Sequence, residues 1–90
     1  METKTFPIFE DPGHGWLRVP IVLLQELGIA HNISKFSYMK GSFAYLEEDC
    51  DAPFFVDAMD KMDVEVKFIE HHTDKESPIR EYDSYKEDAL

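Results

Sequence analysis

Residues 43–52, read FAYLEEDCDA, constrain the fold more strongly than any other stretch of the chain. Phe43 and Tyr45 alternate with smaller residues, a pattern typical of a β-strand. Four carboxylates in five positions follow: Glu47, Glu48, Asp49 and Asp51. Because Asp49 or Asp51 can cap a helix that has Pro53 in its first turn, the chain is expected to pass from strand to helix within this stretch.

The strand in this stretch is predicted to belong to a β-hairpin that turns at Lys40–Gly41, with strands over 35–40 and 42–46. In that register two aromatic pairs lie opposite each other on one face: Tyr38 with Phe43, and Phe36 with Tyr45. Burying these rings at roughly 1.5–3 kcal/mol each would make this face the largest part of the core, so we expect it to pack against the helices. The opposite face, with Ser37 and Ala44, is then left to solvent or to a partner.

The first half of the chain is predicted to hold another hairpin and a short helix. Residues 5–9 and 15–19 have strand character on either side of a turn that contains Pro and Gly. Pro7 lacks the backbone N–H that a strand donates to its neighbour, which places the first strand at an edge of the sheet. The helix is expected to begin at Pro20 and to end at Gly28.

The second half is predicted to continue with a helix, a strand and a polar tail. After Asp51, apolar residues recur at helical spacing on one face: Phe55, Ala58, Met59 and Met62. Val64 then begins a final strand that ends near Glu70. Residues 71–90 are polar and form an irregular tail, in which three side chains are available for docking: Ile79, Tyr82 and Tyr85.

These elements follow a ββαββαβ order along the chain. The prediction is an α+β fold, with a small, mainly antiparallel sheet and two short helices on one face. Ninety residues correspond to a single domain, residues 1–90, whose compact core covers about residues 5–70 and whose polar C-terminal tail covers residues 71–90.

The net charge is −10, and one half of the chain carries it. Residues 1–46 hold four acids and four bases, whereas residues 47–90 hold fifteen acids and five bases. Binding of nucleic acid and of anionic membranes depends on Lys and Arg, so neither is expected as a direct partner. The longest apolar run, 19–24, is far shorter than the roughly twenty residues of a bilayer span. A single cysteine and no secretory leader indicate a cytoplasmic protein.

The acidic surplus has two interpretations. Some of these carboxylates suit helix capping and solubility. The others repel one another, a cost that a basic partner would offset, so the predicted function is non-enzymatic binding to another protein through an acidic surface. The predicted partner-binding residues are Glu47, Glu48, Asp49, Asp51, Asp57, Asp60 and Asp63. A homo-oligomer is compatible with this hypothesis.

A second hypothesis, from another class, is a small-ligand binding protein. His14, Trp16 and Arg18 lie close together in the sequence and, with the aromatic residues of the hairpin, can surround a nucleotide or another anion. Trp16 is interpreted first as a core or interface ring, since most tryptophans have that role. Arg18 is interpreted first as an ion-pair partner of acids in the tail.

A third hypothesis is a metal-assisted enzyme that uses the acidic run together with His71 and His72. The chain lacks the His and Cys spacings of common metal sites, and adjacent residues of a strand point to opposite faces. Cys50 lies among carboxylates that disfavour its thiolate, so it is not expected to be a nucleophile. No enzymatic activity, metal or cofactor is therefore predicted.

Five strings in the chain resemble a known family: HGWL (14–17), LGI (27–29), ISKFSY (33–38), YLEEDCDA (45–52) and SPIREY (77–82). The family consists of small, largely uncharacterised proteins of bacteriophages and bacterial mobile elements. The resemblance spans most of the chain and implies a bacterial or phage-infected cell. There it implies binding to a host or defence protein, as an inhibitor, and it implies no catalytic activity.

Overall fold

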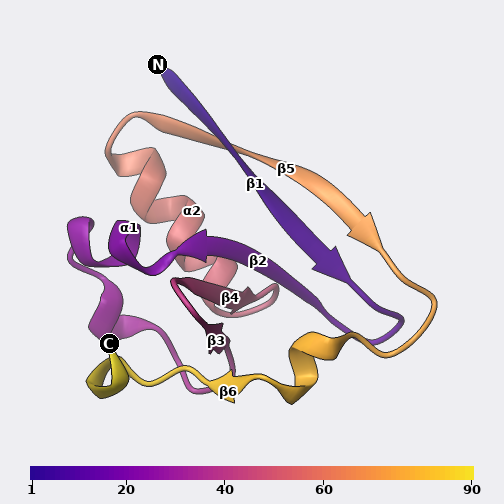
Figure 1. Ribbon diagram of the computed structural model, residues 1–90. Coiled ribbons are helices and arrows are strands. Elements are labelled where there is room, and N and C mark those ends of the chain that lie inside the picture. Colours follow the sequence, from indigo (N-terminus) through magenta and orange to yellow (C-terminus); the bar gives the residue numbers. More distant parts are fainter.

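A computed structural model describes residues 1–90, apart from the side chain of residue 89, and shows a sheet with helices packed on it (Figure 1). The strands are β1 (Glu2–Glu10), β2 (Gly15–Pro20), β3 (Tyr38–Lys40), β4 (Phe43–Glu47), β5 (Val64–His72) and β6 (Asp83–Ser84). The α-helices are α1 (Ile21–Glu26) and α2 (Asp51–Lys61). Short 3₁₀ helices are η1 (Ala30–Asn32), η2 (Pro78–Glu81) and η3 (Glu87–Ala89).

The six-stranded sheet has the order β5-β1-β2-β4-β3-β6. Every pair of neighbours is antiparallel except β1 and β5, which run parallel along their whole length. Both α-helices contribute to one aliphatic core on the same face of the sheet. The predicted α+β class, the ββαββαβ order and the mainly antiparallel sheet are therefore confirmed, with β6 as an additional strand.

The first strand is longer than predicted and does not lie at an edge, because β5 pairs with it on one side and β2 on the other. Pro7 is nevertheless accommodated for a local reason. The pairing with β2 begins only at Ile8, so residues 2–7 of β1 are paired on the β5 side alone. A residue without an N–H is tolerated where one side of its strand carries no ladder.

The second hairpin turns one residue later than predicted, which shifts the cross-strand pairing by two residues. Lys40 pairs with Phe43 and Tyr38 pairs with Tyr45, so Gly41 and Ser42 form the loop. Gly41 has φ +61°, the left-handed conformation that a type II′ turn requires at its first position. Phe36 lies before β3 and is exposed, and its predicted pairing with Tyr45 is wrong.

The face of the hairpin that packs against the helices is the opposite of the one predicted. Ala44 and Leu46 are fully buried and point to the helix side, where they meet the aliphatic residues of β2 and the buried stripe of α2. This core contains Phe6, Ile8, Leu17, Val19, Ile21, Leu24, Ala30, Ile33, Ala44, Leu46, Ala52, Phe55, Met59 and Tyr85. Strand alternation shows which residues share a face, but it does not show which face the helices cover.

Helix α2 buries a narrower stripe than predicted. Phe55 and Met59 are buried as expected, and Phe55 packs edge-on against Phe6. Met62, however, is 66% exposed, because the helix ends at Lys61 and the chain turns sharply towards β5. That turn passes through Asp63, which has φ +61°, a conformation that Asp tolerates better than most residues.

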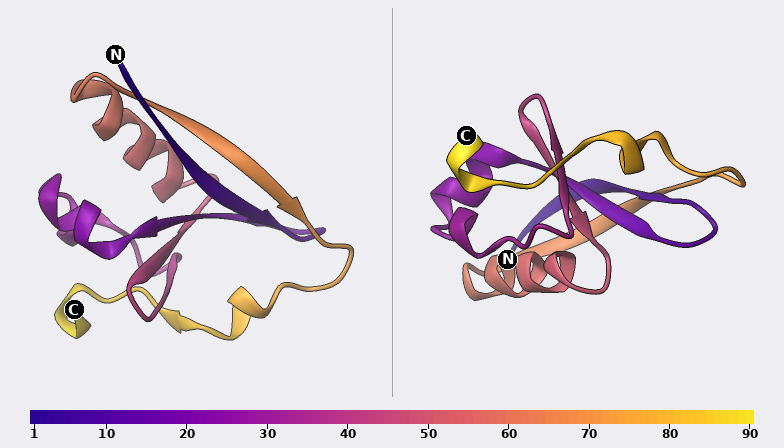
Figure 2. Two further views of the ribbon diagram at one scale, coloured as in Figure 1. Left: turned by 45° about the horizontal axis from the view of Figure 1, so that its top comes forward. Right: turned by 90° about the horizontal axis from the view of Figure 1, so that it is seen from below.

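The aromatic face of the sheet is covered by residues 77–85, here called the return segment. Figure 2 (right) shows this yellow segment and α2 on opposite sides of β1 and β2. Its Ile79 is buried with Trp16 and Tyr45, and Tyr82 packs on the same cluster. The predicted boundary of the compact core near residue 70 is therefore too early, and Ile79 and Tyr85 are confirmed as docking side chains.

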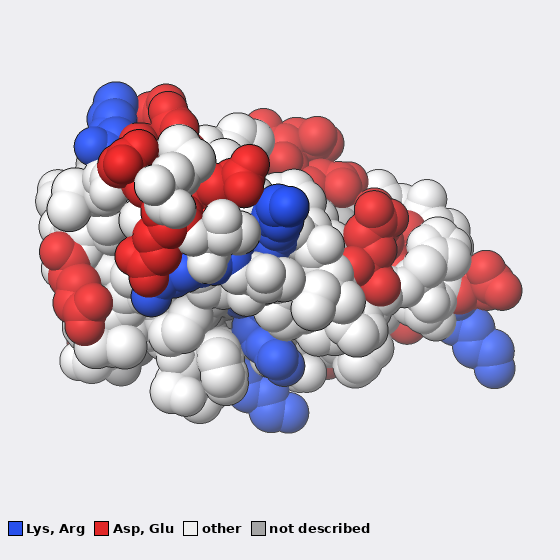
Figure 3. Space-filling view, turned by 90° about the horizontal axis from the view of Figure 1, so that it is seen from above, with Lys and Arg blue, Asp and Glu red and all other residues white. Residues whose placement is uncertain are grey.

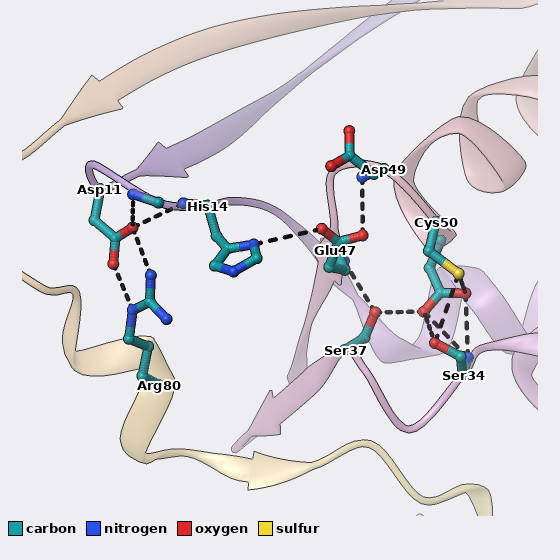
Figure 4. Close-up of polar contacts among 10 residues, drawn as sticks. Asp11, His14, Ser34, Ser37, Glu47, Asp49, Cys50 and Arg80 are labelled. Carbon is teal, nitrogen blue, oxygen red and sulfur yellow. Dashed lines mark hydrogen bonds and ion pairs between the residues drawn. The ribbon is translucent and has the colours of Figure 1, made fainter.

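Polar contacts hold the return segment in place. Arg80 donates to both carboxylate oxygens of Asp11 at 2.7 and 2.9 Å (Figure 4). The Ser77 amide donates to the same carboxylate at 2.9 Å. The Arg80 guanidinium holds the pKa of Asp11 far below its usual range, against the opposing effect of burial. At the far end, the Tyr85 hydroxyl donates to the Ala30 carbonyl at 2.6 Å and its amide donates to the Ser37 carbonyl at 2.8 Å.

Candidate functional site: a groove between α2 and β5

A groove of about 690 Å³ runs between α2 and the outer strand β5. The part of β5 that faces the helix side is only partly covered by α2, so Val64 and Val66 are half-buried and Phe68 is 48% exposed. The apolar lining is completed by Met1, Ile8, Ala52, Pro53 and Val56. The groove is therefore an apolar channel that the fold leaves accessible beside its core.

Four carboxylates line this apolar channel: Glu48, Asp57, Asp60 and Glu65. Three of them are among the predicted partner-binding residues: Glu48 lies in the turn before α2, Asp57 in the middle of the helix and Asp60 in its last turn. Asp57 is partly neutralised by Lys61, whose Nζ lies 3.2 Å from its carboxylate. In Figure 3, red acidic side chains predominate over the end of the molecule where α2 meets β5, with uncharged surface and a few blue basic side chains between them.

Glu48 is the carboxylate whose ionisation the groove disfavours most clearly. Desolvation by burial raises its pKa, and the neighbouring carboxylates of Asp49, Glu10 and Glu47 raise it further. Its side chain packs over Gly15, where a Cβ would lie 2.5 Å from the Glu48 carboxylate oxygen. The absence of a side chain at Gly15 therefore leaves room for the Glu48 carboxylate, at a position where a cation from outside would relieve repulsion.

The outer edge of β5 pairs with no strand of the described chain, because β5 is the first strand in the sheet order. An edge of nine residues offers free N–H and C=O groups beside the groove. Lys67 and Glu70 supply charges on this strand, and Ile69 is 54% exposed on the face away from α2. The groove and the open edge thus form one continuous surface.

The other predicted acidic residues lie elsewhere. Asp49 and Asp63 are exposed but do not line the groove. Glu47 is largely covered: its carboxylate accepts a hydrogen bond from the Asp49 amide at 2.9 Å and lies 3.8 Å from the His14 ring (Figure 4).

Asp51 is neither a cap of its own helix nor part of an exposed surface, because it is 3% exposed and the residue at the N-cap is Cys50. It accepts hydrogen bonds from the backbone and the hydroxyl of Ser34 and from the Ser37 hydroxyl, at 2.5 to 3.1 Å. Ser37, fully buried, in turn accepts a hydrogen bond from the Glu47 amide at 2.9 Å. Asp51 therefore ties the connection before β3 to the start of α2, a long-range role that its place in an acidic run conceals.

The three residues of the ligand hypothesis do not converge on one site. Trp16 is 2% exposed and contacts the rings of Tyr38 and His14, so its interpretation as a core ring is confirmed. Arg18 points into a different cavity, one whose lining includes neither Trp16 nor His14. The expected ion pair of Arg18 with tail acids is absent from the described residues, in which no carboxylate lies within 4.0 Å of it.

Among the described residues, no group of three or more His, Cys, Asp or Glu side chains is arranged to hold a metal ion. None of the described helices has the length and apolar character needed to cross a bilayer. Comparison with protein families, with curated proteins and with solved structures gave no match to this chain. The proposed function is therefore argued from the site and the sequence.

Proposed function

We propose that this protein is a non-enzymatic binding module that takes up a basic, partly apolar segment of a partner protein in the groove between α2 and β5. The observation that carries the proposal is an apolar channel lined by four carboxylates, of which only Asp57 has a cationic partner among the described residues. Apolar side chains of the partner would cover the half-buried residues of β5. Lys or Arg side chains would meet Glu48, Asp60 and Glu65, and would offset the repulsion that raises the pKa of Glu48.

The open edge of β5 suggests the form of the bound segment. An extended segment that adds to β5 as a further strand would satisfy the free backbone groups of the edge. Its side chains would alternate, so that every second one points towards the groove. The positions that point towards the groove should therefore hold both aliphatic and basic residues, to match its apolar lining and its carboxylates.

A second copy of this chain is a poorer occupant of the groove. With a net charge of −10, two copies would bring acidic rims together. A partner with a basic surface has the complementary charge. The resemblance to proteins of phages and mobile elements makes a host or defence protein our proposed source of that surface.

The proposal can be tested with displayed random peptides of nine residues, the length of β5. We expect the selected peptides to carry both basic and aliphatic residues at every second position, on the side that faces the groove, and to shift the backbone NMR signals of β5 and α2. Their binding should weaken as salt rises, because the contacts with the rim are electrostatic. Selected peptides that shift signals only outside α2 and β5 would refute the groove as the binding site.

Two triple variants that change the net charge by the same amount test whether the groove carboxylates act locally or only through the overall charge of the protein. The groove variant carries Glu48→Gln, Asp60→Asn and Glu65→Gln, and the control variant carries Glu26→Gln, Asp74→Asn and Glu87→Gln at exposed positions outside the groove. We expect the groove variant to lower the affinity for the selected peptide by about tenfold or more, and the control to change it far less. Equal losses in the two variants would show that net charge alone, and not the groove, governs binding.

A further inference from the structure

A second cavity, of about 370 Å³, lies on the aromatic face of the sheet, beneath the return segment. The sheet contributes Phe9, Arg18 and Tyr45 to its lining, and the return segment contributes Ser77, Ile79 and Tyr82. Its volume is within the range of small-molecule sites, about 300–1,000 Å³. The cavity exists only because the return segment folds back over the aromatic face.

Arg18 is the central cation of this cavity, and its guanidinium is held by rings instead of carboxylates. It lies 4.8 Å from the centre of the Phe43 ring and 5.4 Å from that of Phe9. In a chain with 19 acids and 9 bases, no described carboxylate lies within 4.0 Å of it. Stacking uses the faces of the guanidinium, so the N–H groups at its edge that do not meet Tyr45 can donate to an anion in the cavity.

The remaining lining supplies flat apolar surface and neutral hydroxyl groups. The Phe9 ring stacks on His71 with centres 5.0 Å apart, and Tyr45 packs edge-on against Tyr82 at 5.1 Å. Desolvation by burial raises the pKa of Tyr45, so its phenol stays protonated at neutral pH. Glu10 also lines the cavity and repels anions, which favours a ligand whose charge is confined to one end, at Arg18.

We propose that the Arg18 cavity binds a phosphate monoester that carries a planar ring, a ligand of the size and chemistry of a nucleoside monophosphate. The phosphate would accept hydrogen bonds from the Arg18 guanidinium, and the ring would stack among the aromatic side chains. This site is independent of the α2–β5 groove, because the two lie on opposite faces of the sheet and share no lining residue. The proposal therefore adds a ligand to the molecule whether or not the groove binds a partner.

The probes are AMP, GMP, CMP and UMP, with adenosine and inorganic phosphate as the two halves of the ligand. We expect at least one monophosphate to bind in calorimetry and to shift the NMR signals of Arg18, Tyr45 and Tyr82. Adenosine and inorganic phosphate should each bind more weakly than the intact nucleotide. If none of the four monophosphates binds, or if inorganic phosphate binds as tightly as they do, the proposal is wrong.

Arg18→Met removes the charge and keeps most of the stem that packs on the rings, and Lys35→Met removes the same charge at an exposed position outside the cavity. Thermal melting establishes that both variants fold. We expect Arg18→Met to weaken nucleotide binding by about tenfold or more, and Lys35→Met to leave it within about twofold. Equal effects of the two substitutions would overturn the assignment of Arg18, while an unchanged affinity in the groove triple variant would show that the two sites are separate.

Discussion

The two faces of the sheet are closed in different ways. On one face, helices that directly follow β2 and β4 in the chain bury an aliphatic core that includes Leu17 and Leu46. On the other face, a segment with little regular structure covers a cluster of aromatic rings, and its main anchor joins Asp11 to Arg80, 69 residues away. Burial of apolar area holds the first face, whereas the second depends on rings and a few directed polar contacts. We therefore expect the second face to open while the first stays folded.

The largest expected effect comes from charge in the helix-covered core. Leu46→Asp places a carboxylate at a fully buried position, at a cost comparable with the whole stability of a small domain, about 5–15 kcal/mol. Circular dichroism should show global unfolding. Met62→Asp is the matched control, because Met62 is 66% exposed and the same change there should leave the fold intact. A folded Leu46→Asp protein would mean that this face is not the main core.

A smaller and local effect is expected from Asp11→Asn. The substitution keeps the size of the side chain and weakens its bonds to Arg80, so the return segment should detach more often. Hydrogen exchange at the Ser77 and Tyr82 amides should accelerate by about tenfold or more, with little change in α2. Asp74→Asn, at an exposed acid, should have no such effect. Uniform acceleration across both faces would show that they unfold together.

Acid should produce the same opening in the unmodified protein. The pKa of Asp11 in the folded protein lies below its ordinary value of 3.8, so its ion pair stabilises the fold fully above that value and loses this contribution as the pH falls further. Arg80 lies 5.3 Å from the centre of the ring of Trp16, the only tryptophan. Tryptophan fluorescence followed as the pH is lowered from about 6 through 3.8 and below should therefore report the release, and in Asp11→Asn this transition should be absent.

The smallest effect on stability is expected from a substitution in the groove, at Glu48. Because the pKa of Glu48 is raised in the folded protein, the protonated form is favoured by folding, and that contribution is lost as the pH rises through the raised value. Glu48→Gln should therefore stabilise the protein at neutral pH by about 1 kcal/mol or less, and the gain should shrink in acid. Urea unfolding at two pH values measures this difference. A loss of stability at neutral pH would show that the Glu48 carboxylate makes a favourable contact that outweighs its repulsion.

The element order of this fold could be predicted because it depends on local patterns. Alternation in residues 43–46, helical spacing around Phe55 and a positive φ at Gly28 are each properties of a short stretch. Local patterns could not show which segment covers each face of the sheet. The aromatic residues of the hairpin share a face as expected, yet the segment that buries them is the one whose polar composition suggested a tail.

The candidate site was predictable only in part. Glu48, Asp57 and Asp60 were found from charge alone, and the structure places them along one groove. Asp51 belongs to the same acidic run, but Ser34 and Ser37 take it into the interior through contacts that span 14 to 17 residues. The sequence signal for that network was Ser37, a small polar residue between two aromatic ones. The structure shows that Ser37 is fully buried. Glu65 was missed because an isolated acid on an alternating strand has the appearance of an ordinary exposed residue.

The tight connection between α2 and β5 has a consequence for how a partner is received. The chain leaves the helix and enters the strand through Met62 and Asp63, whose amides still donate to the last turn of α2. Because this connection is only two residues long, we expect the distance between α2 and β5 to be fixed before a partner binds. The loss of conformational freedom on binding then falls on the incoming segment. Affinity at this site should therefore depend on how rigid the partner segment already is in its free state.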